Sequence, residues 1–306
     1  MFKLAHLSDL HLGPLPRAAS PLDYLSKRAV GYWSWNLRRH GIHEPGIAQE
    51  MISDIKSHAP DHVAVTGDLI NIALPLEFQN AAQWLHNFGS PDWITVVPGN
   101  HDAYVPVPWV TGAGLWTGYM TGDLRMPGAP TGLHLATPFP FVRQRKNIAI
   151  VGVSSAQPQG YRLATGSLGN RQMDNLAATL GALRERGFFR VVLIHHPPLP
   201  GQSPARKALT DAANLKSIIE SQGAELVLFG HNHIHMRATI DTLHGKAHTI
   251  GVPSATTRTG QVYPAAAWYQ YAIRRQDGNW HTRVTVRQLS SCTGKFEKQT
   301  EFDLVN

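Results

Sequence analysis

Five short polar motifs, each placed directly after a short apolar run, constrain this chain more than any other feature of its sequence. The motifs are DLH at 9–11, GD at 67–68, GNHD at 99–102, HH at 195–196 and GHNH at 230–233. Short apolar runs are typical of buried strands, and the loops that follow such strands converge at one edge of an α/β sheet. We therefore expect the fold to bring the five motifs together at a common site.

The motifs are rich in Asp, Asn and His, whose carboxylate, amide and imidazole groups bind hard and borderline divalent cations. Two such ions about 3.5–4 Å apart are a known arrangement for phosphoester chemistry. Asp68 is the best bridging candidate, because each of its two carboxylate oxygens can serve one ion. The motifs offer seven candidate ligands, a number that suits two adjacent ions: Asp9, His11, Asp68, Asn100, His195, His231 and His233.

Apolar runs alternate with helical patterns in the first three quarters of the chain, which predicts βαβ units and a largely parallel sheet. Helices are expected over 45–59, where Pro45 suits a first turn, and over 168–187 and 209–223, which both end at a glycine. The predicted strands are 3–8, 62–67, 93–99, 147–153, 190–195 and 225–230.

After Gly230, apolar and polar residues alternate along segments that are rich in Thr, Val and aromatic residues. This pattern predicts antiparallel strands with a turn at 277–279. The sequence contains no repeat or interdomain linker, so we expect a single domain over 1–306. Two stretches, 13–44 and 103–146, fit no regular unit and follow directly behind candidate ligands. Because long irregular connections in compact domains are usually functional or mobile, we expect both insertions to wall the active cleft.

Part of the first insertion, residues 21–40, has apolar side chains at helical spacing and basic ones elsewhere around the helix. One interpretation is a surface helix that packs on the core or on another subunit. A second is a basic, aromatic lid that meets a nucleotide base, an acyl chain or a lipid headgroup, and peripheral membrane contact is a third. Gly31 is expected to interrupt the helix. The positions at this spacing are Leu22, Leu25, Ala29, Tyr32 or Trp33, and Asn36 or Leu37.

The bulk composition narrows the class of protein. A chain of 306 residues can bury a core large enough to fold without disulfide bonds. Its single cysteine, Cys292, cannot form an intramolecular disulfide. The sequence starts without signal-peptide features and contains no run long enough for a membrane span, which predicts a cytoplasmic protein, with a membrane-peripheral one as the alternative. The net charge of +7 suits an anionic substrate, and without a nucleic-acid-binding motif we do not expect nucleic acid as the main partner.

In this order and spacing, the motifs resemble the calcineurin-like metallophosphoesterase superfamily over about residues 3–255. The resemblance implies an α/β fold of two packed mixed β-sheets flanked by helices, a four-layer αββα sandwich with the metals at one edge. It also implies that His101 contacts the substrate phosphate and protonates the leaving group. It divides the candidate ligands between two ions: Asp9, His11 and His233 at one, Asn100, His195 and His231 at the other, and Asp68 at both.

These features predict a dimetal phosphoesterase that acts on phosphodiesters in preference to monoesters, by attack of a metal-bridging hydroxide. GNHD followed by HHPP resembles bacterial members that include cyclic-nucleotide and glycerophosphodiester phosphodiesterases, so a 3′,5′-cyclic nucleotide is the first substrate hypothesis. The aromatic and basic residues of 21–40 favour an amphiphilic, lipid-linked phosphodiester or pyrophosphate instead. A phosphomonoesterase and a non-catalytic metal-binding scaffold are the remaining alternatives. Four imidazole ligands favour Mn²⁺ or Fe over Mg²⁺, with Zn²⁺ as a further candidate.

Polar residues beside the motifs have simpler interpretations. Asp102 is expected to fix its loop through hydrogen bonds rather than bind an ion. Asn71 either reaches the cleft or caps the following helix. His196 is expected to shape the turn after the HH motif, and His6 to lie in the core. Histidines in polar surroundings are expected to be exposed: His40, His43, His58, His62 and His86.

Overall fold

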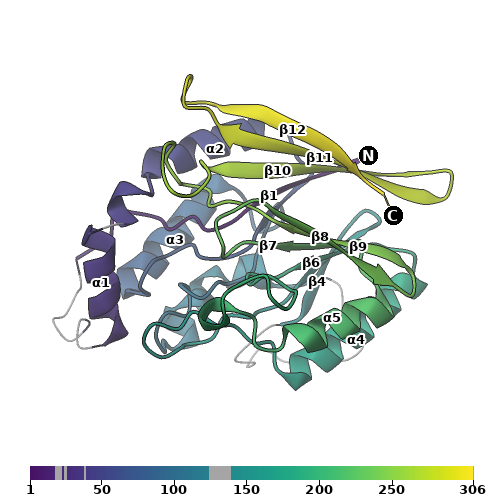
Figure 1. Cartoon of the computed structure of the whole chain (residues 1–306), viewed down its shortest axis with the longest axis horizontal. Coiled ribbons are helices and arrows are strands. Elements are labelled where there is room, and N and C mark those ends of the chain that lie inside the picture. Colours follow the sequence, from purple (N-terminus) through teal and green to yellow (C-terminus); the bar gives the residue numbers. More distant parts are fainter. Residues whose placement is uncertain (18–22, 24–25, 38, 124–138, 306) are drawn as a thin grey trace.

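Two six-stranded sheets pack face to face and carry helices on their outer faces (Figure 1). The computed structural model describes the whole chain apart from residues 18–22, 24–25, 38, 124–138 and 306. The first sheet has the order β12-β11-β10-β1-β2-β3, and the second has the order β4-β5-β6-β7-β9-β8. The four-layer αββα sandwich with two mixed sheets is confirmed.

The first sheet joins a parallel half to an antiparallel half. Strands β1 (Phe2–Leu7), β2 (His62–Val65) and β3 (Ile94–Val96) are parallel neighbours. Strand β10 (Ala267–Gln276) pairs antiparallel with β1 and continues through β11 (Asn279–Leu289) to β12 (Phe296–Leu304). The turn predicted at 277–279 joins β10 to β11.

The second sheet is parallel at its centre. Strands β5 (Ile148–Gly152), β6 (Phe189–Leu193), β7 (Leu226–Phe229) and β9 (Gly245–Gly251) run in the same direction. The edges are antiparallel: β4 (Phe141–Arg145) pairs with β5, and β8 (Met236–Thr242) pairs with β9. Parallel strands need covering helices on the outer face, and α4 (Asn170–Glu185) and α5 (Ala212–Gln222) lie there in Figure 1.

Side-chain alternation along the strands of the second sheet divides the core between two faces. Ile150 and Val191 belong to the cluster shared with the first sheet, whereas their neighbours Val151 and Val192 pack with α4 and α5. On the other side, α2 (Pro45–Ser57) is fixed to the first sheet by Asp54, whose carboxylate accepts hydrogen bonds from side chains of β10 and β11.

The predicted strands and the helices α2, α4 and α5 are confirmed within a few residues. Among the α-helices and strands of the described residues, three were not predicted: α3 (Pro75–Phe88), β4 and β12. The expectation that 103–146 holds no regular unit is therefore wrong, because it contains β4 and two 3₁₀ helices, η3 (Trp109–Thr111) and η4 (Ala113–Met120). In its described part, η4 contacts α3 and β3, and β4 pairs with β5.

Helix α1 (Lys27–Leu37) lies within the first insertion, and Gly31 does not interrupt it. A Cβ atom on Gly31 would lie 2.5 Å from a methyl group of Ile72, so glycine lets the helix approach the site loops closely. The buried residues of α1 are Gly31 and Trp35, whereas Trp33 and Leu37 are exposed. Of the other positions named for their helical spacing, Tyr32 is partly buried and Ala29 is exposed, while Leu22 and Leu25 lie outside the described residues.

The basic residues at the start of α1 bond to backbone carbonyls of neighbouring segments. Arg28 donates from Nη2 to Ala73 O (2.6 Å) and from Nε to Ile72 O (3.3 Å). Lys27 donates from Nζ to Leu163 O (3.1 Å). These bonds tie the helix to the loop that follows the GD motif and to the segment after β5.

Exposure of the histidines outside the motifs was predicted correctly for His40 and His86 but not for His43 and His62. His62 is buried because it lies on β2, where its Nε2 is 2.7 Å from Thr95 Oγ1 of β3. His58 is partly buried at the end of α2. His6 is buried in β1, as expected.

Candidate metal centre

The five motifs meet at one edge of the packed sheets. DLH, GD and GNHD follow β1, β2 and β3 of the first sheet, and HH and GHNH follow β6 and β7 of the second. Within each sheet these strands are parallel neighbours, so their carboxyl ends lie side by side. All seven candidate ligands are buried or nearly so.

One group of candidate ligands joins the DLH loop to the GHNH loop. Asp9 Oδ1 lies 3.1 Å from His233 Nε2. The Nε2 atoms of His11 and His233 are 3.3 Å apart, although these residues are 222 positions apart in the sequence. Asp9 also accepts a hydrogen bond from the backbone N–H of His231 (2.9 Å), which fixes the two loops to each other.

A second group joins the GNHD, HH and GHNH loops. His195 Nε2 lies 3.1 Å from Asn100 Oδ1 and 3.2 Å from His231 Nδ1. Asp68 lies between the two groups, with its Oδ2 atom 3.4 Å from His195 Nε2 and 3.9 Å from His11 Nε2. The arrangement thus contains two sets of oxygen and nitrogen donors with one carboxylate next to both.

Backbone carbonyls orient the imidazole rings. His195 Nδ1 donates to Thr66 O (2.7 Å), and His231 Nε2 donates to Lys207 O (2.9 Å). A carbonyl can only accept, so each of these rings carries a hydrogen on the outward nitrogen and, when neutral, a lone pair on the nitrogen that faces the other ligands. This is the tautomer that binds a metal.

The backbone at the ligands is strained. Five of the seven candidates have φ in the left-handed region: Asp9 (55°), His11 (42°), Asp68 (54°), His231 (70°) and His233 (58°). Non-glycine residues in this region each cost of order 1–3 kcal/mol and cluster at functional sites. The strain concentrates on the residues that the motifs single out.

Asp102 holds the strained loops together. Its carboxylate accepts hydrogen bonds from the N–H groups of Asp68 (2.9 Å), Leu69 (2.9 Å), Ile70 (3.2 Å) and Gly99 (2.8 Å). Both oxygens are thereby occupied by backbone donors. The expectation that Asp102 fixes its loop is confirmed.

Two motif glycines are required by close approach to the carboxylates. A Cβ atom on Gly99 would lie 2.2 Å from Asp68 Oδ1, and one on Gly230 would lie 2.3 Å from Asp9 Oδ2. Real Cβ contacts are never this short, so any larger residue would displace a candidate ligand. This explains why glycine precedes Asn100 and His231.

Burial and charge set the protonation of the donors. Burial lowers the pKa of His11 and of His231 well below the usual value, which favours neutral imidazole. Burial alone would raise the pKa of Asp68, but the nearby His195 and His101 lower it well below the usual value. For His195, the attraction of Asp68 and Asp9 outweighs burial and raises the pKa to about 9.

The donor set fits a pair of divalent cations. Asp9 Oδ1 is buried and accepts no hydrogen bond from the described residues, although His233 Nε2 is close. Buried carboxylate oxygens are normally satisfied, so this atom is suited to a cation. Asp68, His195 and His231 have ligand atoms within 4.8 Å of one another, as do His11, Asp68 and His101.

His101 lies beside the first group. Its Nδ1 donates to Asn71 O, and its ring stacks on Tyr104 with centroids 5.5 Å apart and planes inclined by 10°. Asn71 is itself buried, and its Nδ2 donates to Leu12 O (3.0 Å). Asn71 therefore orients His101 and does not cap the next helix, whose N-cap is Leu74.

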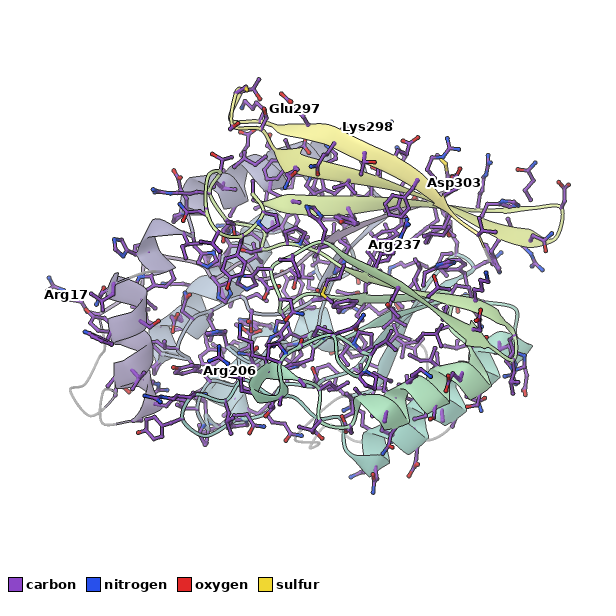
Figure 2. All side chains as sticks on the ribbon, viewed as in Figure 1. Arg17, Arg206, Arg237, Glu297, Lys298 and Asp303 are labelled. Atoms are coloured by element: carbon purple, nitrogen blue, oxygen red, sulfur yellow. The ribbon has the colours of Figure 1, made fainter. Side chains whose placement is uncertain are left out.

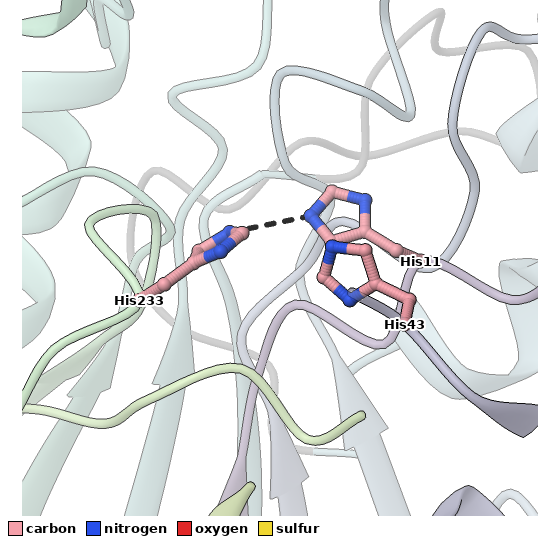
Figure 3. Close-up of side chains that lie close together, drawn as sticks. All are labelled: His11, His43 and His233. Carbon is pink, nitrogen blue, oxygen red and sulfur yellow. Dashed lines mark hydrogen bonds between the residues drawn. The ribbon is translucent and has the colours of Figure 1, made fainter. Parts of the chain in front are cut away.

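His43 is a site residue that the motifs did not indicate. It is 6% exposed, and its ring centroid lies 4.7 Å from that of His11 and 5.9 Å from that of His233. Figure 3 shows His11 and His43 side by side, with His233 facing them. Ligand nitrogens of the three rings lie within 4.8 Å of one another. The only sequence indication was that the insertion carrying His43 begins directly behind DLH.

Other residues shape the surroundings of the site. His196 is buried with Nδ1 2.7 Å from Ser155 Oγ and Nε2 donating to Ala164 O (3.1 Å), so it supports the turn, as expected. Lys207, whose carbonyl orients His231, follows the exposed Arg206 labelled in Figure 2. Arg17, also labelled there, is exposed beside α1.

Comparisons with known proteins identify the family of this chain. The family model for calcineurin-like phosphoesterase matches residues 2–235. A Synechococcus protein described as a probable cyclic nucleotide phosphodiesterase is 23% identical over 289 residues, which cover 92% of this chain and 91% of that protein. The chain therefore belongs to the calcineurin-like phosphoesterase family, a family of metal-dependent phosphoester hydrolases.

Solved structures show the same fold. A dimetal phosphatase from Danio rerio superposes with a TM-score of 0.61 at 12% identity, covering 99% of this chain and 98% of that chain. A purple acid phosphatase from yellow lupin seeds superposes with a TM-score of 0.56 at 10% identity, covering 99% of this chain and 53% of that chain. At such identities the likeness concerns the fold alone.

Proposed function

We propose that this protein hydrolyses a phosphodiester at a two-ion centre built from the five motif loops. One ion is held by the DLH and GHNH loops, the other by the GNHD, HH and GHNH loops, and Asp68 serves both. The observation that carries the proposal is the position of Asp68 between two sets of buried donors. The complete division is Asp9, His11 and His233 at the first ion and Asn100, His195 and His231 at the second.

Two divalent ions bound there would supply a water of lowered pKa and would neutralise the charge that develops on the phosphoryl oxygens. The residues of the chain hold the candidate ligands in the positions that this chemistry requires. Backbone carbonyls hold His195 and His231 in the ligand tautomer, and Asp102 keeps the loops fixed. The binding geometry is thus prepared before the substrate arrives.

His101 is the residue we assign to the leaving group. Its Nδ1 donates to a backbone carbonyl, so a proton on Nε2 gives a cationic ring that can pass this proton to a departing alkoxide. Stacking on Tyr104 and the edge contact with His11 hold the ring in place. These contacts fix the orientation of the ring, and the assignment of His101 to the leaving group follows from the family resemblance of the GNHD motif.

A 3′,5′-cyclic nucleotide is the substrate we favour. The resemblance of GNHD and HHPP to cyclic-nucleotide enzymes and the description of the Synechococcus relative support it. Manganese or iron is the metal we favour, because imidazole nitrogens outnumber hard oxygen donors, and zinc remains a candidate.

Hydrolysis of 3′,5′-cAMP with Mn²⁺ tests this proposal, with bis(4-nitrophenyl) phosphate and 4-nitrophenyl phosphate as generic diester and monoester. A kcat/KM for cAMP at or above about 10⁴ M⁻¹s⁻¹ supports a cyclic-nucleotide phosphodiesterase. Faster cleavage of the aryl monoester than of both diesters would contradict the diester assignment.

A second candidate, an amphiphilic lipid-linked diester or pyrophosphate, is favoured by the outer face of α1. Val30, Trp33 and Leu37 follow helical spacing on this face and are 50%, 67% and 59% exposed. Among the described residues, no helix combines the length and apolar character that a bilayer span requires. Turnover of a lipid diester in vesicles, with little turnover of cAMP, would move the assignment to this candidate.

A further inference from the structure

His43 lies at the candidate metal centre but comes from outside the five motifs. It precedes α2 in the chain, and the insertion 13–44 carries it to the edge where the DLH and GHNH loops meet. It is 6% exposed, and one of its ring nitrogens lies within 4.8 Å of ligand nitrogens of His11 and His233 (Figure 3). The question is what this third imidazole does.

Neighbouring hydroxyls determine which nitrogen of His43 carries the hydrogen. Thr256 Oγ1 donates its only hydrogen to Leu10 O (2.8 Å). Ser254 Oγ, 3.5 Å from His43 Nδ1, donates its hydrogen to Asp9 O (2.7 Å). Because both hydroxyl hydrogens go to backbone carbonyls, His43 Nδ1 must donate to Thr256 Oγ1 (2.9 Å). A neutral ring that donates from Nδ1 accepts through Nε2.

The backbone and a stacked tryptophan hold His43 in this orientation. His43 forms an antiparallel bridge with Thr257, and Arg258 N donates to Ile42 O (2.9 Å) beside it. The ring of buried Trp35 lies parallel to that of His43, with centroids 6.3 Å apart and planes inclined by 7°. A ligand held in this way loses little conformational freedom when an ion binds.

We propose that His43 is an additional metal ligand, bound through Nε2 to the ion that Asp9, His11 and His233 hold. The inference rests on the two-ion centre of the proposed function. A hydrogen bond from Nε2 to a substrate phosphate is the competing role; it needs a second ring proton, as proposed for His101, whereas metal binding needs only the neutral ring. Three imidazoles at one position also favour Zn²⁺ or Fe²⁺ over Mg²⁺ there.

A crystal structure of the wild-type protein, stripped with a chelator and reloaded with Zn²⁺, tests the proposal without any substitution. With the ions located by anomalous scattering, His43 Nε2 is expected about 2.1 Å from the ion at Asp9. A separation above about 3 Å from both ions would overturn the inference while leaving the two-ion centre intact. Failure of the wild-type protein to bind either Zn²⁺ or Mn²⁺ would overturn both.

The substitution His43→Ala tests the same point in solution through zinc affinity, measured by competition with a chromophoric chelator. We expect one of the two sites to weaken by at least about tenfold and the other to keep its affinity. Thr256→Val, which removes the acceptor of Nδ1 and retains the ring, should weaken the same site by a smaller factor. The matched control is His281→Ala, an exposed histidine on β11, which should leave both sites unchanged.

Substrate kinetics distinguish metal binding by His43 from a hydrogen bond between His43 and the substrate phosphate. If His43→Ala kept both wild-type zinc affinities and raised only the KM for bis(4-nitrophenyl) phosphate, the ring would contact the substrate and the proposal would be overturned. Weakened zinc binding together with reduced kcat is the expected pattern.

Discussion

The insertions 13–44 and 103–146 both begin directly behind candidate ligands, yet their described parts differ in what they bring to the metal centre. The first returns to the centre, where His43 pairs with Thr257 beside the loop after β9. The second contributes Tyr104 against His101 and then packs on α3 and β3 through Trp116 and Arg143. Position behind a motif therefore does not decide the role of an insertion, whereas backbone pairing beside the site does.

Substitutions in the motif loops are expected to have the largest effects on kcat, and the effects of substitutions in the two insertions are compared with them. Asn100→Ala and His195→Ala should each reduce kcat for bis(4-nitrophenyl) phosphate by about 10³-fold or more, because a lost ligand removes several kcal/mol of charge stabilisation. The fold should survive, as measured by circular dichroism. Turnover within tenfold of wild type for both variants would contradict the two-ion centre.

A substitution of His101 tests the residue on which Tyr104 of the second insertion stacks. His101→Ala should reduce kcat by about 10²–10⁴-fold, the range for loss of a general acid, while the bound metal per chain stays unchanged. Metal content is measured by inductively coupled plasma mass spectrometry. His86→Ala, an exposed histidine on α3, is the control. Loss of an ion from His101→Ala would mean that this residue is a ligand.

Arg143 tests whether the second insertion is structural. Its guanidinium is buried and donates to Thr121 O (2.8 Å), Ile94 O (2.9 Å) and Gly118 O (2.6 Å). Arg143→Met should lower the free energy of unfolding by about 3 kcal/mol, because several buried carbonyls lose their donor. Urea denaturation measures the change, and Arg274→Met, at an exposed position, should change it by less than about 0.5 kcal/mol.

In folded Arg143→Met, kcat for the aryl diester should match the wild type. A large fall in kcat with little change in stability would show that the second insertion acts on the centre.

The smallest effect is expected on the outer face of the first insertion. Trp33→Ser should leave turnover of a small soluble diester unchanged, because this side chain is 67% exposed and faces away from the core. If the substrate is amphiphilic, turnover in vesicles should fall a few-fold, and Leu243→Ser, at an exposed turn on β8–β9, should have no such effect. Reduced turnover of the soluble diester would show that α1 acts on the centre itself.

Sequence alone predicted most of the strands and the convergence of the motif loops, because both follow from short-range patterns. Helix α3 was missed although Phe78, Ala81, Leu85 and Phe88 repeat at helical spacing, since Leu74 gives no polar capping signal. Strand β12 was missed because only its first and last residues are buried, so it shows no alternation of apolar side chains.

The position of His43 could not be predicted for a different reason. Its burial depends on a backbone bridge to Thr257 and on Trp35, contacts between residues that no periodic pattern relates. The candidate ligands lie in short motifs directly after strands, so their meeting point follows from strand order. The residues of an insertion do not directly follow a predicted strand, so strand order does not indicate where they lie.

Titration of chelator-stripped protein with Mn²⁺, while hydrolysis of bis(4-nitrophenyl) phosphate is followed, shows whether activity depends on two bound ions. We expect negligible activity without metal and a rate that reaches its maximum at two bound ions per chain. Full activity without metal or at one ion, or no hydrolysis with two ions bound, would contradict the proposed function.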